Sequence, residues 1–177
     1  MSFKQSLIKK IKSKKAKILI VGLGYVGLPI CLEFVNKNYN VIGFDSDISK
    51  INLLKQYKSY IHQINLDKYK KKLKKYFIPT NNKSFYGEAD IIVFCLPTPL
   101  NKNLTPDLKY VSNSLKDYYK FMRKGQVLCF ESTSYPGTTK EYFISLIKKK
   151  KLQLGKDIFL VYSPEREDPG NQKFKIN

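Results

Sequence analysis

The 177-residue sequence contains no tryptophan, two arginines, one histidine and three cysteines. It also lacks any apolar run near the roughly 20 residues that span a bilayer, and its first fifteen residues lack the apolar block of a secretory signal. We therefore expect a cytoplasmic protein. Cys31, Cys95 and Cys129 are odd in number and widely spaced, which excludes a disulfide scaffold and a CxxC metal pair. Each lies in an apolar stretch and is interpreted as a small buried side chain.

Acidic residues are scarce beside basic ones, since 14 Asp and Glu accompany 33 Lys and Arg and the net charge is +19. One interpretation is a protein that binds nucleic acid or an anionic membrane. The other is a lysine-rich chain whose runs at residues 4–17, 68–75 and 148–151 form solvated helix faces. Arginine is preferred for bidentate base and phosphate recognition, yet only Arg123 and Arg166 are present. We favour solvated faces and expect neither a specific nucleic-acid partner nor membrane insertion.

Apolar residues make up 42% and aromatic residues 14% of the chain, too many for a disordered protein. Short apolar runs indicate buried strands at residues 17–21, 40–45, 89–96, 126–131 and 157–162. Helical patterns lie between them, at residues 28–36, 48–57, 66–76, 106–122 and 138–150. This alternation predicts an α/β fold, a doubly wound parallel sheet of the Rossmann type with about six strands.

The alternating pattern places one Rossmann domain at residues 16–162. The basic residues 1–15 precede it, with Leu7, Ile8 and Ile11 spaced for a short amphipathic helix, although a loose leader fits this segment equally well. Residues 163–177 form a tail with two prolines, one glycine and no periodicity.

Residues 22–27 read Gly-Leu-Gly-Tyr-Val-Gly, a GxGxxG pattern that directly follows the first strand and opens a helix. There Gly22 permits a tight turn, Gly24 lets a pyrophosphate approach the backbone, and Gly27 lets the helix pack closely. The N–H groups and dipole of the helix favour phosphate. Asp45 ends the next strand and can accept hydrogen bonds from the adenosine ribose, and its charge would repel a 2′-phosphate, so we predict NAD rather than NADP. The alternative is a tight turn that binds nothing.

Three further segments follow: CLPTPL at residues 95–100, ESTSYPGTT at 131–139 and YSPEREDPGN at 162–171. With GLGYVGLP at 22–29, their order resembles the UDP-glucose/GDP-mannose dehydrogenase family over residues 16–174. The last two segments are most similar to the branch that oxidises UDP-N-acetylhexosamines, such as UDP-N-acetylglucosamine 6-dehydrogenases. The resemblance implies an NAD-dependent oxidoreductase that converts the primary alcohol of a UDP sugar to a carboxylate, using two NAD⁺, to supply surface polysaccharide precursors.

The resemblance also implies cofactor contacts by motif position. Asp45 matches the ribose-binding acid, Lys50 a basic residue near the adenosine end, and Thr98 a residue that lines the cofactor. Lys50 could equally be an ordinary helix lysine. The implied pyrophosphate contacts are the glycine turn and its neighbours, namely Gly22, Gly24, Tyr25, Val26 and Gly27.

Catalytic and substrate roles are implied for three more residues. Thr133 matches a threonine that contacts the cofactor and helps position a water near the reacting carbon. Glu165 matches a glutamate assigned to substrate binding and acid–base work, and Arg166 is expected to meet substrate or a neighbouring carboxylate. The alternatives are that Thr133 only turns the chain before Pro136 and that Glu165 only forms a surface ion pair.

The resemblance covers less than half of a family chain. The second half of the family's chains carries a nucleophilic cysteine, a catalytic lysine and most sugar-nucleotide contacts, and none of the three cysteines here matches that nucleophile. We expect a truncated piece that binds NAD⁺ without completing the reaction alone. Its expected partners are a UDP-sugar substrate and the missing C-terminal half or a second subunit.

Three other functions compete with this one. The chain could be a stand-alone dinucleotide-binding module without catalysis, a basic nucleic-acid binder on an α/β scaffold, or a β-hydroxyacid dehydrogenase. Cofactor domains of the last class share the GxGxxG setting, but the segment at residues 162–171 argues against it.

Overall fold

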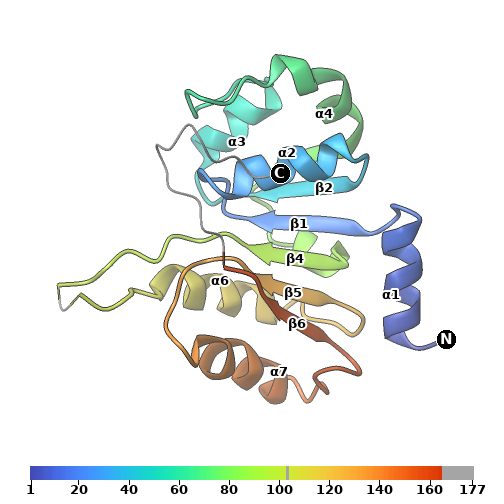
Figure 1. Ribbon diagram of the computed structural model, residues 1–177, viewed down its shortest axis with the longest axis vertical. Coiled ribbons are helices and arrows are strands. Elements are labelled where there is room, and N and C mark those ends of the chain that lie inside the picture. Colours follow the sequence, from blue (N-terminus) through green and yellow to red (C-terminus); the bar gives the residue numbers. More distant parts are fainter. Residues whose placement is uncertain (103, 165–177) are drawn as a thin grey trace.

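A six-stranded parallel sheet forms the centre of the computed structural model, which describes residues 1–102 and 104–164 (Figure 1). The strands are Lys17–Val21 (β1), Asn40–Phe44 (β2), Phe77–Thr80 (β3), Ile91–Phe94 (β4), Val127–Phe130 (β5) and Phe159–Tyr162 (β6). Their order is β3-β2-β1-β4-β5-β6, and every neighbouring pair is parallel. The predicted doubly wound sheet is confirmed, and this strand order is that of the Rossmann fold.

Helices cover both faces of the sheet. They are Phe3–Lys12 (α1), Gly27–Asn36 (α2), Ile48–Lys55 (α3), Lys70–Tyr76 (α4), Phe85–Glu88 (α5), Lys109–Tyr119 (α6) and Ser145–Lys149 (α7). A 3₁₀ turn at Asp67–Tyr69 precedes α4, and a π-helical turn at Thr139–Ile144 precedes α7. Buried side chains of α2, α3 and α4 share one core, and those of α5, α6 and α7 share the other.

The central strand β1 feeds both cores because its side chains alternate between the faces of the sheet. Ile18 and Ile20 join the core under α2, whereas Leu19 and Val21 join the core under α6. All four are at most 1% exposed. Burial of each such side chain contributes about 1.5–3 kcal/mol, which explains why a continuous apolar run was a reliable strand signal.

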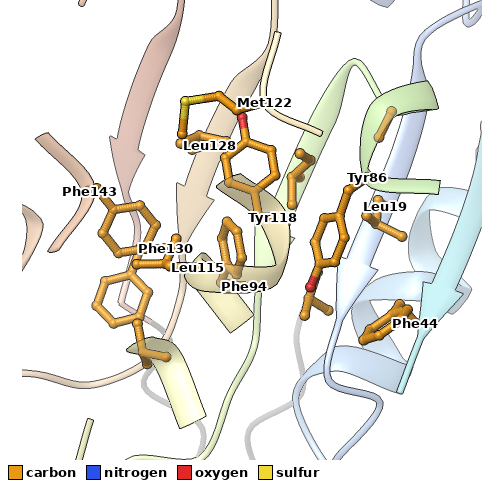
Figure 2. Close-up of a cluster of buried hydrophobic side chains, with 14 of the residues drawn as sticks. Leu19, Phe44, Tyr86, Phe94, Leu115, Tyr118, Met122, Leu128, Phe130 and Phe143 are labelled. Atoms are coloured by element: carbon orange, nitrogen blue, oxygen red, sulfur yellow. The ribbon is translucent and has the colours of Figure 1, made fainter. Parts of the chain in front are cut away.

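The core under α6 is rich in aromatic rings (Figure 2). The Phe143 ring lies 5.5 Å from Phe94 and 5.1 Å from Phe130, between centroids. The buried Gln126 is satisfied, since its Oε1 accepts from the Tyr118 hydroxyl at 2.8 Å and its Nε2 donates to two carbonyls. This packing fixes α6 and the helix after β5, and therefore the loops that lead into them.

The N-terminal segment is a helix, which resolves the two alternatives left open for residues 1–15. The Ser2 hydroxyl accepts from the Gln5 N–H while the Gln5 side chain accepts from the Ser2 N–H, a capping box. Leu7 is buried, and the Lys10 ammonium lies 2.7 Å from the Asp90 carboxylate. Figure 1 shows α1 at the edge of the sheet where β1 begins.

Strand β3 was not located from the sequence. It follows α4 without a break, holds Pro79 and exposes Ile78, so it shows none of the apolar pattern of a buried strand. The Thr80 carbonyl accepts from the Asp45 N–H at 3.2 Å, which extends the pairing with β2. The short helix α5 was also missed, and the helix predicted at 106–122 is limited to α6.

The lysine runs lie mostly on exposed surface of α1, α4 and the end of α7, as the solvated-face interpretation expected. Among the described residues, no helix combines the length and apolarity that crossing a membrane requires.

Candidate functional site

A cleft of about 920 Å³ lies along the edge at which the strands end. Four segments meet there: the turn after β1, the end of β2 and the loops after β4 and β5. Ligands in doubly wound sheets bind beyond the carboxyl ends of the strands. The predicted cofactor residues that line this cleft are Gly22, Gly24, Tyr25, Val26, Asp45, Lys50, Thr98 and Thr133. Gly27 is buried at the start of α2 instead.

The three glycines of the turn differ in what surrounds them. Gly22 has a φ of +91°, and a Cβ there would overlap the Cys95 carbonyl. A Cβ on Gly27 would overlap the Gly22 carbonyl, so both positions are closed by the protein itself. At Gly24 nothing lies within 4 Å of a Cβ position. The turn is therefore tight where it packs on the protein and open at one position beside the cleft, which fits a pyrophosphate close to the backbone.

Backbone donors also collect at the start of α2. Leu28 is the first residue here whose N–H enters the helical pattern, donating to the Gly24 carbonyl at 3.1 Å. Within the described part of the chain, the N–H groups of residues 24–27 have no protein acceptor. Such unsatisfied donors and the positive end of the helix dipole attract an anion. The residues present therefore suit a diphosphate.

Asp45 is 8% exposed and lies directly after β2. Its Oδ2 accepts from the Leu23 N–H at 2.9 Å, and its Oδ1 accepts from the Asp47 N–H at 2.9 Å. The Lys50 ammonium is 3.3 Å from Oδ2. A carboxylate offers about four acceptor positions, so these three contacts hold the group in place and leave room for a ribose hydroxyl.

Lys50 is more than a helix lysine in this structure. Its ammonium contacts Asp45 and also lies 5.7 Å from the centroid of the Tyr60 ring. The Tyr60 hydroxyl in turn donates to the Leu23 carbonyl inside the glycine turn. Tyr60 could not be recognised from the sequence, because it lies in a segment without a repeating pattern.

The loops after β4 and β5 are joined at the cleft. The Thr98 hydroxyl donates to the Thr133 carbonyl at 2.8 Å, and the Ser132 hydroxyl accepts from the Leu96 N–H at 2.9 Å. Ser132 is 8% exposed, so it supports the loops rather than facing solvent. The structure brings Thr98 and Thr133 together from segments 35 residues apart.

The interpretation of all three cysteines as buried holds only for Cys31, because Cys95 and Cys129 are half-buried. Cys95 follows β4 and lines the cleft. Cys129 projects from β5, and its thiol donates to the Glu131 carboxylate at 3.2 Å. Burial, with that hydrogen bond, raises the pKa of Cys129 to about 12, and burial also raises the pKa of Cys31. Neither of these two thiols is therefore a ready nucleophile at neutral pH.

The site differs from the prediction in two further respects. Glu165 and Arg166 lie outside the described residues. Helix α6 contributes a wall that sequence analysis did not assign to the site. The residues of α6 that line the cleft are Tyr110, Asn113, Ser114 and Asp117.

Known proteins share both the sequence motifs and the fold of this chain. The family model described as the UDP-glucose/GDP-mannose dehydrogenase family, NAD binding domain, matches residues 16–176. Protein CapL of Staphylococcus aureus is 38% identical over 156 residues, which cover 88% of this chain and 36% of CapL. A UDP-N-acetyl-D-glucosamine 6-dehydrogenase of Pseudomonas aeruginosa is 32% identical over 165 residues, covering 93% of this chain and 38% of that enzyme.

A solved structure gives the same picture. The UDP-N-acetyl-mannosamine dehydrogenase Cap5O from Staphylococcus aureus aligns with a TM-score of 0.80 at 29% sequence identity. The alignment covers 88% of this chain and 37% of Cap5O. The chain thus spans little more than a third of the length of these relatives.

Proposed function

This chain belongs to the UDP-glucose/GDP-mannose dehydrogenase family, and from that premise we propose that it forms the NAD-binding part of an enzyme that oxidises a UDP-N-acetylhexosamine. The observation that carries the proposal is the single cleft that gathers the glycine turn, Asp45, Thr98 and Thr133 from four strand ends. The family match makes NAD the cofactor. A non-catalytic module and a nucleic-acid binder are not favoured.

Each group of residues has a part in binding. The N–H groups at the start of α2 would hold the pyrophosphate, and Asp45 would accept from the adenosine ribose while Lys50 fixes its orientation. Thr98 and Thr133 would border the nicotinamide side, with their loops held together by their mutual hydrogen bond. When bound, NAD⁺ supplies the hydride acceptor for oxidation of the sugar's primary alcohol. The roles of Glu165 and Arg166 toward substrate stay predictions.

The second oxidation in this family uses a thiol, as the resemblance implies. Cys31 and Cys129 are poor candidates because their pKa values are raised, and Cys95, which lines the cleft, does not match the position of the family's nucleophile. We therefore propose that this chain binds NAD⁺ but needs the catalytic part of a family enzyme to complete the reaction. Residues 16–162 would be the cofactor domain and residues 163–177 would lead toward the substrate domain.

Titration calorimetry with NAD⁺ on the full chain tests the proposal. We expect saturable binding and a melting temperature that rises with NAD⁺ as mass action requires. Gly24→Ala should weaken binding about tenfold or more, because its Cβ enters the open side of the turn without disturbing the fold. Gly87→Ala, a glycine of α5 with ordinary neighbours, is the matched control. Absence of binding by the wild-type chain at millimolar NAD⁺ would refute the proposal.

A further inference from the structure

One face of α6 forms a polar wall of the cleft. Its members recur three or four residues apart, as one helix face requires, and they are Tyr110, Asn113, Ser114 and Asp117. The neighbouring face of α6 is apolar and buried, through Val111, Leu115 and Tyr118. The wall therefore has a fixed orientation, because the core holds the other face of the helix.

The wall contrasts with the strong positive charge of the chain. Lys109 and Lys116 of the same helix lie outside the cleft. In the part of the chain that the structure describes, one ammonium pairs with the wall, since Lys83 Nζ lies 2.8 Å from Asp117 Oδ2. Lys83 and Asp117 both line the cleft, so a hydrogen-bond donor and an acceptor stand side by side there. Among the described residues, none hydrogen-bonds to the side chain of Asn113, and Tyr110 as a residue is 54% exposed.

The position of this wall follows from the rest of the site. With the pyrophosphate at the glycine turn and the ribose at Asp45, the base of the adenosine half must lie beyond Asp45. On the α3 side, Lys50 and Tyr60 line the cleft, and their polar groups are engaged with Asp45 and with the Leu23 carbonyl. On the α6 side, the cleft-lining Tyr86 connects the end of β2 with the polar wall, since its ring lies 5.4 Å from the Phe44 ring and its hydroxyl lies 2.9 Å from Ser114 Oγ. The base is therefore directed to α6.

We propose that this wall reads the adenine base of the dinucleotide. Asp117 accepts a hydrogen bond from the exocyclic N6 amine, Lys83 donates to the adjacent N7, and the Tyr110 ring packs on the base. Adenine presents this amine donor and ring acceptor next to each other on one edge, which matches the side-by-side pair of Asp117 and Lys83. The inference rests on the proposed binding of NAD⁺ in the cleft, and it adds the groups that select the base.

Nicotinamide hypoxanthine dinucleotide is the probe, because its base has a carbonyl oxygen in place of the N6 amine and a hydrogen on N1, while the N7 acceptor is unchanged. That oxygen would face the acceptor-only Asp117. We expect calorimetry on the full chain to show binding about tenfold weaker than for NAD⁺, as for a site whose acceptor loses its donor. Asp117→Asn should reduce this preference to about twofold, since an amide can turn to donate or accept.

Two further variants sharpen the test. Tyr110→Ala should weaken both dinucleotides by the same factor, about fivefold, because stacking does not depend on the exocyclic group. Lys116→Ala, on the same helix but outside the cleft, should leave both affinities and their ratio unchanged. Melting temperatures of all variants check that the fold is retained.

The possible results distinguish a failure of the adenine proposal from a failure of the proposed NAD⁺ binding. Tight NAD⁺ binding with no preference over the hypoxanthine analogue would overturn the adenine wall and leave the cofactor site standing. A preference that survives Asp117→Asn would also overturn it, because another group would then read the amine. Failure of both dinucleotides to bind the wild-type chain would overturn the proposed function itself.

Discussion

Asp45 and Asp90 are similar carboxylates that lie at opposite ends of the parallel strands, Asp45 where they end and Asp90 where they begin. Asp45 is 8% exposed and Asp90 is 3% exposed, and each accepts from a backbone N–H and from a lysine ammonium. Asp45 follows β2 and opens onto the cleft. Asp90 precedes β4 and is enclosed by Lys10 of α1, the Lys17 N–H and Arg123.

Whether an aspartate binds a ligand or stabilises the fold therefore depends on which end of a strand it occupies, the carboxyl end or the amino end, and not on the chemistry of its side chain. Carboxyl ends of parallel strands meet where loops diverge and leave a crevice. At the other edge, α1 and the loop before β5 close over the strand starts. A buried aspartate there has all its partners within the protein, so we expect it to stabilise the fold and not to touch a ligand.

The largest expected effect comes from Asp90→Ala. It should lower the free energy of unfolding by about 2–3 kcal/mol, because the Lys17 N–H loses its acceptor and two cations lose their counter-charge. Urea unfolding measures this change. Glu88→Ala, which removes a half-exposed partner of Lys17, should cost about 0.5 kcal/mol or less. A tenfold loss of NAD⁺ affinity in folded Asp90→Ala protein would contradict the assignment of Asp90 to structure.

A smaller effect is expected from Asp45→Ala, and it is a loss of NAD⁺ affinity rather than a loss of stability. Loss of a charged acceptor for the ribose should raise the Kd for NAD⁺ about tenfold, or about 1.4 kcal/mol, and should reduce the preference over NADP⁺ because Lys50 is left unpaired. Calorimetry with both dinucleotides measures this. Asp67→Ala, an exposed aspartate away from the cleft, is the control. The comparison breaks if Asp45→Ala leaves the Kd unchanged and unfolds as easily as Asp90→Ala.

The smallest effect is the share of the pH dependence of stability that Asp90 contributes. Burial raises the pKa of this carboxyl, but hydrogen bonds from Lys10 and the Lys17 N–H together with the Lys10 charge lower it further, so the net pKa lies below its usual value. The stabilisation is therefore complete above the unfolded pKa of about 3.9 and is lost as the pH falls through the lower folded value. Urea unfolding from neutral to acid pH should show a shallower acid loss in Asp90→Asn than in wild type. Equal acid slopes would contradict the prediction.

Local pattern predicted much of the fold and of the cleft. The five apolar runs became β1, β2, β4, β5 and β6. The first four are inner strands, and strands buried on both faces need continuous apolar sequence. The outer strand β6 was found because it is also apolar, although its last two residues are exposed. The glycine turn and Asp45 were found because their spacing follows from one β-α-β unit. The other outer strand, β3, was missed because its four residues include Pro79 and an exposed Ile78, which leaves no continuous apolar run.

The parts of the site that sequence did not reveal depend on contacts between distant segments. Tyr60 reaches the Leu23 carbonyl across 37 residues, and Lys83 meets Asp117 from another loop. The cleft-lining face of α6 reads in sequence as an ordinary polar helix face. Only the packing of Val111 and Leu115 into the core turns it toward the cleft. The spacing of residues along the chain does not show which distant segments come into contact in the fold.

The two outer strands differ in the hydrogen bonds that they can still form. The Thr80 carbonyl of β3 is used by β2, so the alternation of the backbone turns the nitrogen of Pro79 outward, where it has no hydrogen to donate. On β6, the Phe159 and Ser163 N–H groups donate to β5, which turns the Leu160 N–H outward. A strand from another chain could therefore accept a hydrogen bond from the Leu160 N–H of β6, whereas β3 has no donor at Pro79. Judged from residues 1–102 and 104–164, strand addition to this sheet is therefore expected at β6 rather than at β3.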